Sequence, residues 1–121
     1  EGVEAGGGSS KRVSVVAVLD IVREGDLIGQ LVVGPLGLHQ KVIFGRLPSC
    51  DVVAEHASIS RQHAAISIDM TGTLLLTDLG SGHGTKLDDT WLRPNAPKQL
   101  RVGSTIKLAA SSREYKVVKI E

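Results

Sequence analysis

Short apolar segments alternate with polar residues along most of the chain. In the segment 64–69, Ala64, Ile66 and Ile68 fall on one face, and the three intervening residues fall on the other. A two-residue period of this kind is typical of a β-strand. The same pattern, with its β-branched residues, predicts strands over residues 13–22, 30–33, 41–44, 51–53, 64–69, 73–78, 99–102, 104–109 and 115–120.

Turn-forming residues separate these segments at regular intervals. Glycine, proline, serine and aspartate cluster at residues 23–26, 47–49, 70–72 and 102–103, where they favour tight turns. No segment combines a helical period with capping residues. Many short strands joined by turns predict an all-β fold of the sandwich type.

Composition and charge narrow the class of protein. Apolar residues make up 41% of the 121 residues, which is enough for one domain with a core of its own. Because Phe, Trp and Tyr occur once each, the core must come from Val, Ile, Leu and Ala. The formal net charge of +1 lacks the basic excess of a duplex-binding domain, so we expect no direct nucleic acid partner.

The chain divides into a tail and one domain. Residues 1–12 contain Gly6-Gly7-Gly8-Ser9-Ser10, which predicts a flexible tail or linker, and residues 13–121 form the domain. No apolar run is long enough to span a membrane, and no signal-peptide pattern opens the chain. The single Cys50 excludes an internal disulfide, which fits a cytosolic or nuclear setting.

Two polar loops, Ser58–His63 and Gly80–Thr85, are rich in hydrogen-bond donors and lie between predicted strands. Arg46 follows the apolar strand 41–44. A phosphate monoester carries nearly two negative charges and three acceptor oxygens. An arginine can meet two of these oxygens, and a serine hydroxyl such as that of Ser60 can meet the third. These residues therefore suggest a phosphate site.

The order and spacing of three motifs strengthen this interpretation. The motifs are Gly45-Arg46, Ser60-x-x-His63 and Ser81-x-His83-Gly84-Thr85. Together they resemble the signature of forkhead-associated (FHA) domains, and the resemblance covers nearly all of 13–121. It implies about eleven strands in two mainly antiparallel sheets, with binding loops at one end.

Finer features point to one subgroup of this family. Leu92-Arg93-Pro94 is similar to the nuclear inhibitor of protein phosphatase 1, and 111–115 is similar to the Smad nuclear-interacting protein. The same subgroup includes kanadaptin. The resemblance implies a protein-interaction domain that docks phosphothreonine-containing partners, acts as a monomer, needs no cofactor and works in the nucleus or cytoplasm. The nucleus is favoured, with RNA-processing or signalling proteins as partners.

The resemblance also assigns roles by position. Arg46 and Ser60 would bind the phosphate, and Arg61 would add a second positive contact. His83 stands where the family usually has an Asn that holds the peptide backbone, and Gly82 stands where some members have a Thr. Four further residues, Gly45, His63, Gly84 and Thr85, would hold the loops rather than touch the ligand.

Other functions fit the sequence less well. A Ser–His nucleophile pair needs a third group and an oxyanion hole, and neither Ser60/His63 nor Ser81/His83 lies in a nucleophile elbow, so no enzyme is expected. Cys50, His56 and His63 lack the paired spacing of a zinc site. Arg12-Val13-Ser14-Val15 lacks the aromatic residue of a phosphatase-docking motif. A phosphate-independent interaction through a sheet face or the Trp91 loop stays open as the alternative.

Overall fold

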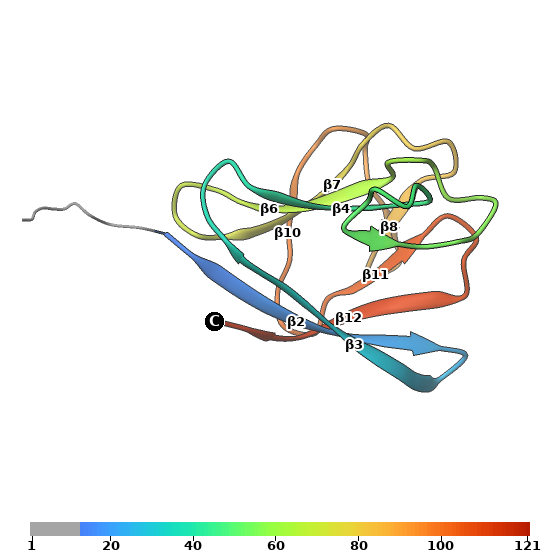
Figure 1. Ribbon diagram of the computed structural model, residues 1–121, viewed down its shortest axis with the longest axis horizontal. Helices are drawn as coiled ribbons and strands as arrows, with labels where there is room; N and C mark the ends of the chain where they lie inside the picture. The colour runs from blue at the N-terminus through green and yellow to red at the C-terminus, as the bar shows by residue number, and fades with distance from the viewer. Residues whose placement is uncertain (1–12) are drawn as a thin grey trace, which may run out of the picture.

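The structure, a computed structural model, describes residues 13–121 as two β-sheets that enclose a shared core (Figure 1). The tail predicted for residues 1–12 lies outside the described residues. Within 13–121 there are eleven strands and no helix, so the predicted all-β sandwich is confirmed. It follows that no helix in this part of the chain could cross a membrane.

The larger sheet has six strands, and all of its neighbouring strands are antiparallel. In lateral order they are β3 (Asp26–Leu36), β2 (Val15–Arg23), β12 (Arg113–Ile120), β11 (Thr105–Leu108), β8 (Thr85–Leu87) and β9 (Thr90–Trp91).

The smaller sheet has five strands. In lateral order they are β10 (Lys98–Gln99), β7 (Leu74–Asp78), β6 (Ala64–Ile68), β4 (Lys41–Gly45) and β5 (Val52–Val53). β4 and β5 run parallel, with Phe44 beside Val52, and the other pairs are antiparallel. The expected pair of mainly antiparallel sheets is therefore confirmed.

The core between the sheets consists mostly of aliphatic side chains, as the composition predicts. One aromatic contact connects the layers: the rings of Phe44 in β4 and Tyr115 in β12 meet edge to face, with centroids 5.2 Å apart. Such a pair stabilises a fold by about 0.5–1.5 kcal/mol beyond burial of its surface. Because Phe44 directly precedes Gly45 and Arg46, this contact fixes the strand end from which Arg46 projects.

Several strand limits differ from the predicted ones. β3 begins at Asp26 rather than at residue 30, because Leu27 and Ile28 are exposed on an edge strand and Gly29 follows them, which hides the alternation. The Glu24-Gly25 turn has positive φ at both residues (51° and 85°), as a two-residue hairpin of matching twist requires.

Other differences concern short strands near the carboxyl half. The strand predicted over residues 99–102 is wrong beyond Gln99, since Ser104 N donates to Arg101 O and closes a turn. The strands β8 and β9 were not predicted, because three and two residues are too few to show a period.

Leu76 provides a test of the core. It is fully buried in β7, so Leu76→Ala should lower the free energy of unfolding by about 2–5 kcal/mol through lost burial and a cavity. Leu27→Ala, at a side chain that is 64% exposed, should change it by no more than about 0.5 kcal/mol. Denaturant titration measures both values, and equal effects would contradict the assigned core.

Candidate functional site

The loops that carry the three motifs meet at one end of the sandwich, on the right in Figure 1. Backbone hydrogen bonds hold them together: Arg46 N donates to Ser60 O at 3.0 Å, and Leu79 N donates to His63 O at 2.9 Å. Residues distant in the sequence are thereby brought onto one surface. The positions of the individual side chains decide what this surface can bind.

Arg46 is exposed, but its side chain is anchored. Its Nε donates to Ile59 O at 3.0 Å, while its two terminal nitrogens make no hydrogen bond to the other described residues. Nor does Arg46 form an ion pair within residues 13–121, where the two ion pairs are Lys107–Glu114 and Lys119–Glu121. The guanidinium is thus held in place with two donor groups and its full charge available.

Gly45 allows the Arg46 strand to approach the next loop closely. A Cβ atom at position 45 would lie 2.1 Å from Arg61 O and 2.8 Å from Cys50 Sγ. Cys50 Sγ in turn lies 3.1 Å from Arg61 O, to which it can donate. Only a residue without a side chain fits here, and this packing sets the position of the neighbouring Arg46.

Ser60 connects two of the loops through its hydroxyl group. Ser60 Oγ accepts a hydrogen bond from Gly82 N at 3.0 Å, so the hydroxyl hydrogen remains available to a further acceptor. Arg61 and His83 are exposed in the same two loops, and their side chains form no hydrogen bond with the rest of the described chain. The surface therefore presents donors and positive charge, with no carboxylate paired to it.

His63 lies under this surface and is fully buried. Its Nδ1 accepts a hydrogen bond from Ser60 N at 3.0 Å. Since a backbone N–H can only donate, Nδ1 carries no hydrogen, and the Nε2–H group donates to Gly84 O at 2.8 Å. One neutral imidazole thus links the Ser60 loop to the Gly84 loop.

Asp78 organises the loop from Gly80 to Thr85. Its carboxylate is buried and accepts from Gly80 N and Ser81 N, both at 3.1 Å, and from the hydroxyls of Ser81 and Thr85 at 2.5 and 2.7 Å. Burial alone would raise the pKa of Asp78, but these hydrogen bonds outweigh it and lower the pKa below its ordinary value of 3.8.

Gly84 lies at the end of this loop, and the ring of Trp91, the only tryptophan of the chain, packs against it. Gly84 has a φ of +87°, and a Cβ atom there would lie 2.9 Å from the ring of Trp91. The indole therefore rests on the Gly84 backbone, with Lys86 Nζ 5.0 Å from its centroid. Because half of Trp91 is exposed, its ring borders the loop that carries His83.

The described residues contain no group of three or more His, Cys, Asp or Glu side chains that could hold a metal ion. The arrangement of Arg46, Ser60 and their neighbours instead suits an oxyanion with several acceptor atoms. An FHA domain model matches residues 42–109, which include all three motifs. The chain belongs to the FHA family. FHA domains are protein-interaction modules that generally bind phosphothreonine.

Relatives of this FHA domain include the three proteins of the predicted subgroup. The nuclear inhibitor of protein phosphatase 1 from Homo sapiens is 37% identical over 80% of this chain and 27% of that protein. Human kanadaptin is 37% identical over 60% and 11%, and mouse Smad nuclear-interacting protein 1 is 30% identical over 66% and 22%. The chain thus spans about a quarter or less of these relatives.

Solved structures show the same fold. The FHA domain of an Arabidopsis thaliana hypothetical protein has a TM-score of 0.74 and 27% identity, covering 94% of this chain and 93% of that one. EmbR from Mycobacterium tuberculosis, solved in complex with a low-affinity phosphopeptide, has a TM-score of 0.65 and 25% identity over 85% and 24%.

The structure brings the predicted ligand residues together in two adjacent loops and at the end of β4. Ser60 is hydrogen-bonded to both Arg46 and Gly82. The neighbouring residues Arg61 and His83 flank them. The ligand roles of these five residues stay predictions.

Sequence reasoning gave no role to Asp78 or to the packing of Trp91 on Gly84. The signal for Asp78 was present, since an Asp before a Gly-Ser-Gly run favours side-chain-to-backbone hydrogen bonds. The packing of Trp91 had no such signal, because it depends on the pairing of β8 with β9.

Asp78 generates a prediction about stability and pH. Asp78→Asn should lower the free energy of unfolding at pH 7 by about 1–3 kcal/mol, because the charge-assisted hydrogen bonds are lost. The folded-state pKa is lowered, so the contribution of the carboxylate is present above pH 4 and lost as the pH falls through the folded pKa, below 3.8. The difference between wild type and variant should therefore shrink in acid.

Denaturant titrations from pH 7 down to pH 3 measure this difference. Asp26→Asn, at an exposed carboxylate in the β2–β3 hairpin, is the matched control and should leave stability nearly unchanged. A difference between Asp78→Asn and wild type that stays constant with pH would contradict the assigned role of the carboxylate.

Proposed function

We propose that this domain binds phosphothreonine peptides, with Arg46 and Ser60 as the phosphate contacts. The observation that carries the proposal is the Arg46 guanidinium, which Ile59 O holds while its terminal nitrogens make no hydrogen bond within residues 13–121. A charge that is already positioned loses little conformational entropy when it binds. A docked phosphate would need no rearrangement of this side chain.

The donors of the site match a phosphate monoester. The terminal nitrogens of Arg46 can meet two phosphate oxygens, and the Ser60 hydroxyl can donate to a third while its oxygen still accepts from Gly82 N. Arg61 adds positive charge at the rim. Because the charge of the phosphate is close to −2 at neutral pH, two arginines that form no ion pair with the described carboxylates balance it.

The peptide backbone would lie over the Gly82-His83 part of the site. His83 is exposed and takes the place of the usual Asn, and an imidazole can donate to a peptide carbonyl as an amide does. Gly82 leaves open space, since a Cβ there would meet only Ser60 Oγ, at 4.0 Å. Selectivity for threonine over serine is part of the proposal and rests on the FHA resemblance.

Two solved FHA structures support the proposal. EmbR carries a phosphopeptide on the same fold, and another similar FHA structure, 25% identical with a TM-score of 0.64, comes from work on phosphothreonine-dependent interactions. The relative named as a nuclear phosphatase inhibitor favours a nuclear setting. We therefore propose phosphorylated nuclear proteins, including RNA-processing factors, as partners. Phosphatase inhibition is not proposed for this domain.

The first test is the affinity of the domain for phosphothreonine peptides, measured by calorimetry against phosphoserine and unphosphorylated versions. Arg46→Ala should weaken binding by at least about tenfold, because hydrogen bonds to a charged group contribute roughly 1.5–3 kcal/mol each. The matched control is Arg101→Ala, which removes the same charge from a turn outside the site.

Phosphate recognition would be contradicted if unphosphorylated peptides bound with equal affinity. It would also be contradicted if Arg46→Ala bound the phosphothreonine peptide as tightly as wild type does. Either outcome would favour the alternative of a phosphate-independent surface. Trp91 borders the apolar part of a hollow of about 450 Å³ and would be the first residue to examine there.

Trp91 also provides a direct optical test. It is the only tryptophan and rests on Gly84, next to His83, so binding at this loop should change its fluorescence. We expect saturable changes with phosphothreonine peptide and none with Arg46→Ala at the same concentration. Trp91→Phe removes the signal and serves as the control. Peptide binding seen by calorimetry with unchanged emission would place the peptide elsewhere.

A further inference from the structure

A hollow of about 450 Å³ lies between one edge of the larger sheet and one edge of the smaller sheet. Its lining comes from β9, from β10 and from the segment that joins these two edge strands. This Trp91 hollow is lined by Leu87, Asp88, Thr90, Trp91, Leu92, Arg93, Lys98 and Gln99. None of these residues belongs to the three motifs, so the FHA signature assigns the hollow no role.

The apolar part of the hollow has an exposed aromatic side chain in it. Trp91 is 55% exposed, although Leu87 and Leu92 beside it are partly buried against the core. A large aromatic side chain in a concave site next to aliphatic groups is the composition of a protein-interaction hot spot. The hollow therefore suits an apolar side chain of a partner.

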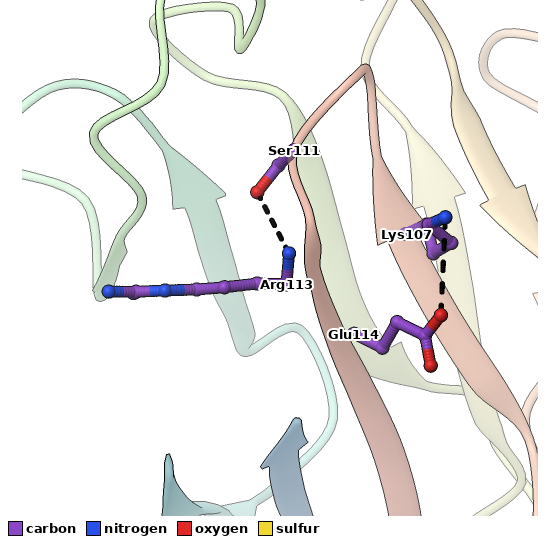
Figure 2. Close-up of polar contacts among 4 residues, drawn as sticks. All are labelled: Lys107, Ser111, Arg113 and Glu114. Carbon is purple, nitrogen blue, oxygen red and sulfur yellow. Dashed lines mark hydrogen bonds and ion pairs between the residues drawn. The ribbon is translucent and has the colours of Figure 1, made fainter. Parts of the chain in front are cut away.

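Two exposed cations lie beside this apolar surface. Arg93 and Lys98 line the hollow, and neither forms an ion pair within residues 13–121. Lys107 of β11, by contrast, is paired with Glu114 at 4.0 Å (Figure 2). The charges of Arg93 and Lys98 are thus complementary to carboxylates of a partner.

The two aspartates at the other end of the hollow are explained by the turn that they form. Asp88 and Asp89 connect β8 to β9 with φ values of 48° and 67°, which aspartate tolerates better than most residues. Asp88 also exchanges two hydrogen bonds with Thr105, since its N donates to Thr105 O at 3.0 Å and its Oδ1 accepts from Thr105 N at 2.8 Å. No contact of this kind accounts for Arg93 and Lys98.

β9 also presents main-chain groups at the outer edge of the larger sheet. Leu92 N donates to Thr85 O at 2.9 Å, so the main-chain groups of Leu92 point toward β8. Because these groups alternate along a strand, the N–H and C=O of Trp91 point away from β8. An extended segment of a partner can pair with them by strand addition.

We propose that the Trp91 hollow docks an unphosphorylated, extended segment of a second protein. The segment places an apolar side chain against Trp91 and its carboxylates beside Arg93 and Lys98. The proposal does not rest on phosphopeptide binding, since the hollow contains none of the proposed phosphate contacts. The domain would then have two separate binding surfaces, of which only one depends on a kinase.

A single-stranded nucleic acid fits this surface less well than a protein segment does. Bases stack on an open aromatic face, but the Gly84 backbone and Lys86 Nζ already lie against the Trp91 ring. Asp88 and Asp89 would also repel the phosphates of the strand.

The first experiment selects ligands from a displayed library of short, unphosphorylated random peptides with the intact chain. Wild type should enrich peptides in which an apolar residue has aspartate or glutamate neighbours. Arg46→Ala should bind the enriched peptides within about twofold of wild type. The proposal would be overturned by a library without enrichment, by enriched peptides that lack acidic residues, or by binding that Arg46→Ala abolishes.

The second experiment measures the affinity of the most enriched peptide by calorimetry. Trp91→Ala should weaken binding by at least about tenfold, and Arg93→Glu and Lys98→Glu by at least about fivefold each. Lys41→Glu is the matched control and should bind within about twofold of wild type. Lys41 is exposed at the start of β4, three strands from β10 in the smaller sheet. Wild-type affinity in Trp91→Ala, or in both charge-reversal variants, would overturn the proposal.

A charge exchange separates a ligand role from a structural role. A peptide with lysine in place of its acidic residues should bind Arg93→Glu more tightly than it binds wild type, which an unfolded variant could not do. Weaker binding of this peptide to Arg93→Glu than to wild type would contradict the assigned charge complementarity. Oligouridylate provides the nucleic acid arm, and displacement of the acidic peptide by this RNA at a lower concentration than the peptide's own would overturn the protein partner.

Discussion

The candidate site depends on one buried imidazole. His63 accepts from Ser60 N and donates to Gly84 O, so it joins the two loops that carry the remaining motifs. The His63 side chain is fully buried, and a buried polar group that loses its partner costs about 1–3 kcal/mol because it stays unsatisfied. The spacing Ser60-x-x-His63 therefore lets one imidazole accept from Ser60 N and reach the Gly84 loop.

The groups that hold the loops in place are different from the charged groups that face the candidate site. The loops are held by Asp78 and by backbone carbonyls, while Arg46 is oriented by Ile59 O rather than by a carboxylate. A carboxylate partner would neutralise the guanidinium, but a carbonyl group orients it and leaves its charge available. The Asp78 carboxylate lies under the loop and accepts hydrogen bonds from Gly80, Ser81 and Thr85.

The alternation of residues predicted the fold class and most of the long strands, because burial on one face imposes a period of two. It did not predict β8 and β9, which exist through pairing with β11 and with each other. The motifs predicted which loops meet, but not the contacts beneath them. Asp78 and Trp91 act through tertiary packing. The Trp91 hollow also depends on it, because its walls come from both sheets.

The central claim is that a phosphate enters a site already formed by Arg46 and Ser60. A crystal structure of the domain with a phosphothreonine peptide tests it most directly. The account predicts phosphate oxygens about 3 Å from the Arg46 terminal nitrogens and from Ser60 Oγ, with Arg46 Nε still bonded to Ile59 O. A phosphate bound away from these atoms, or turned toward solvent, would contradict the account.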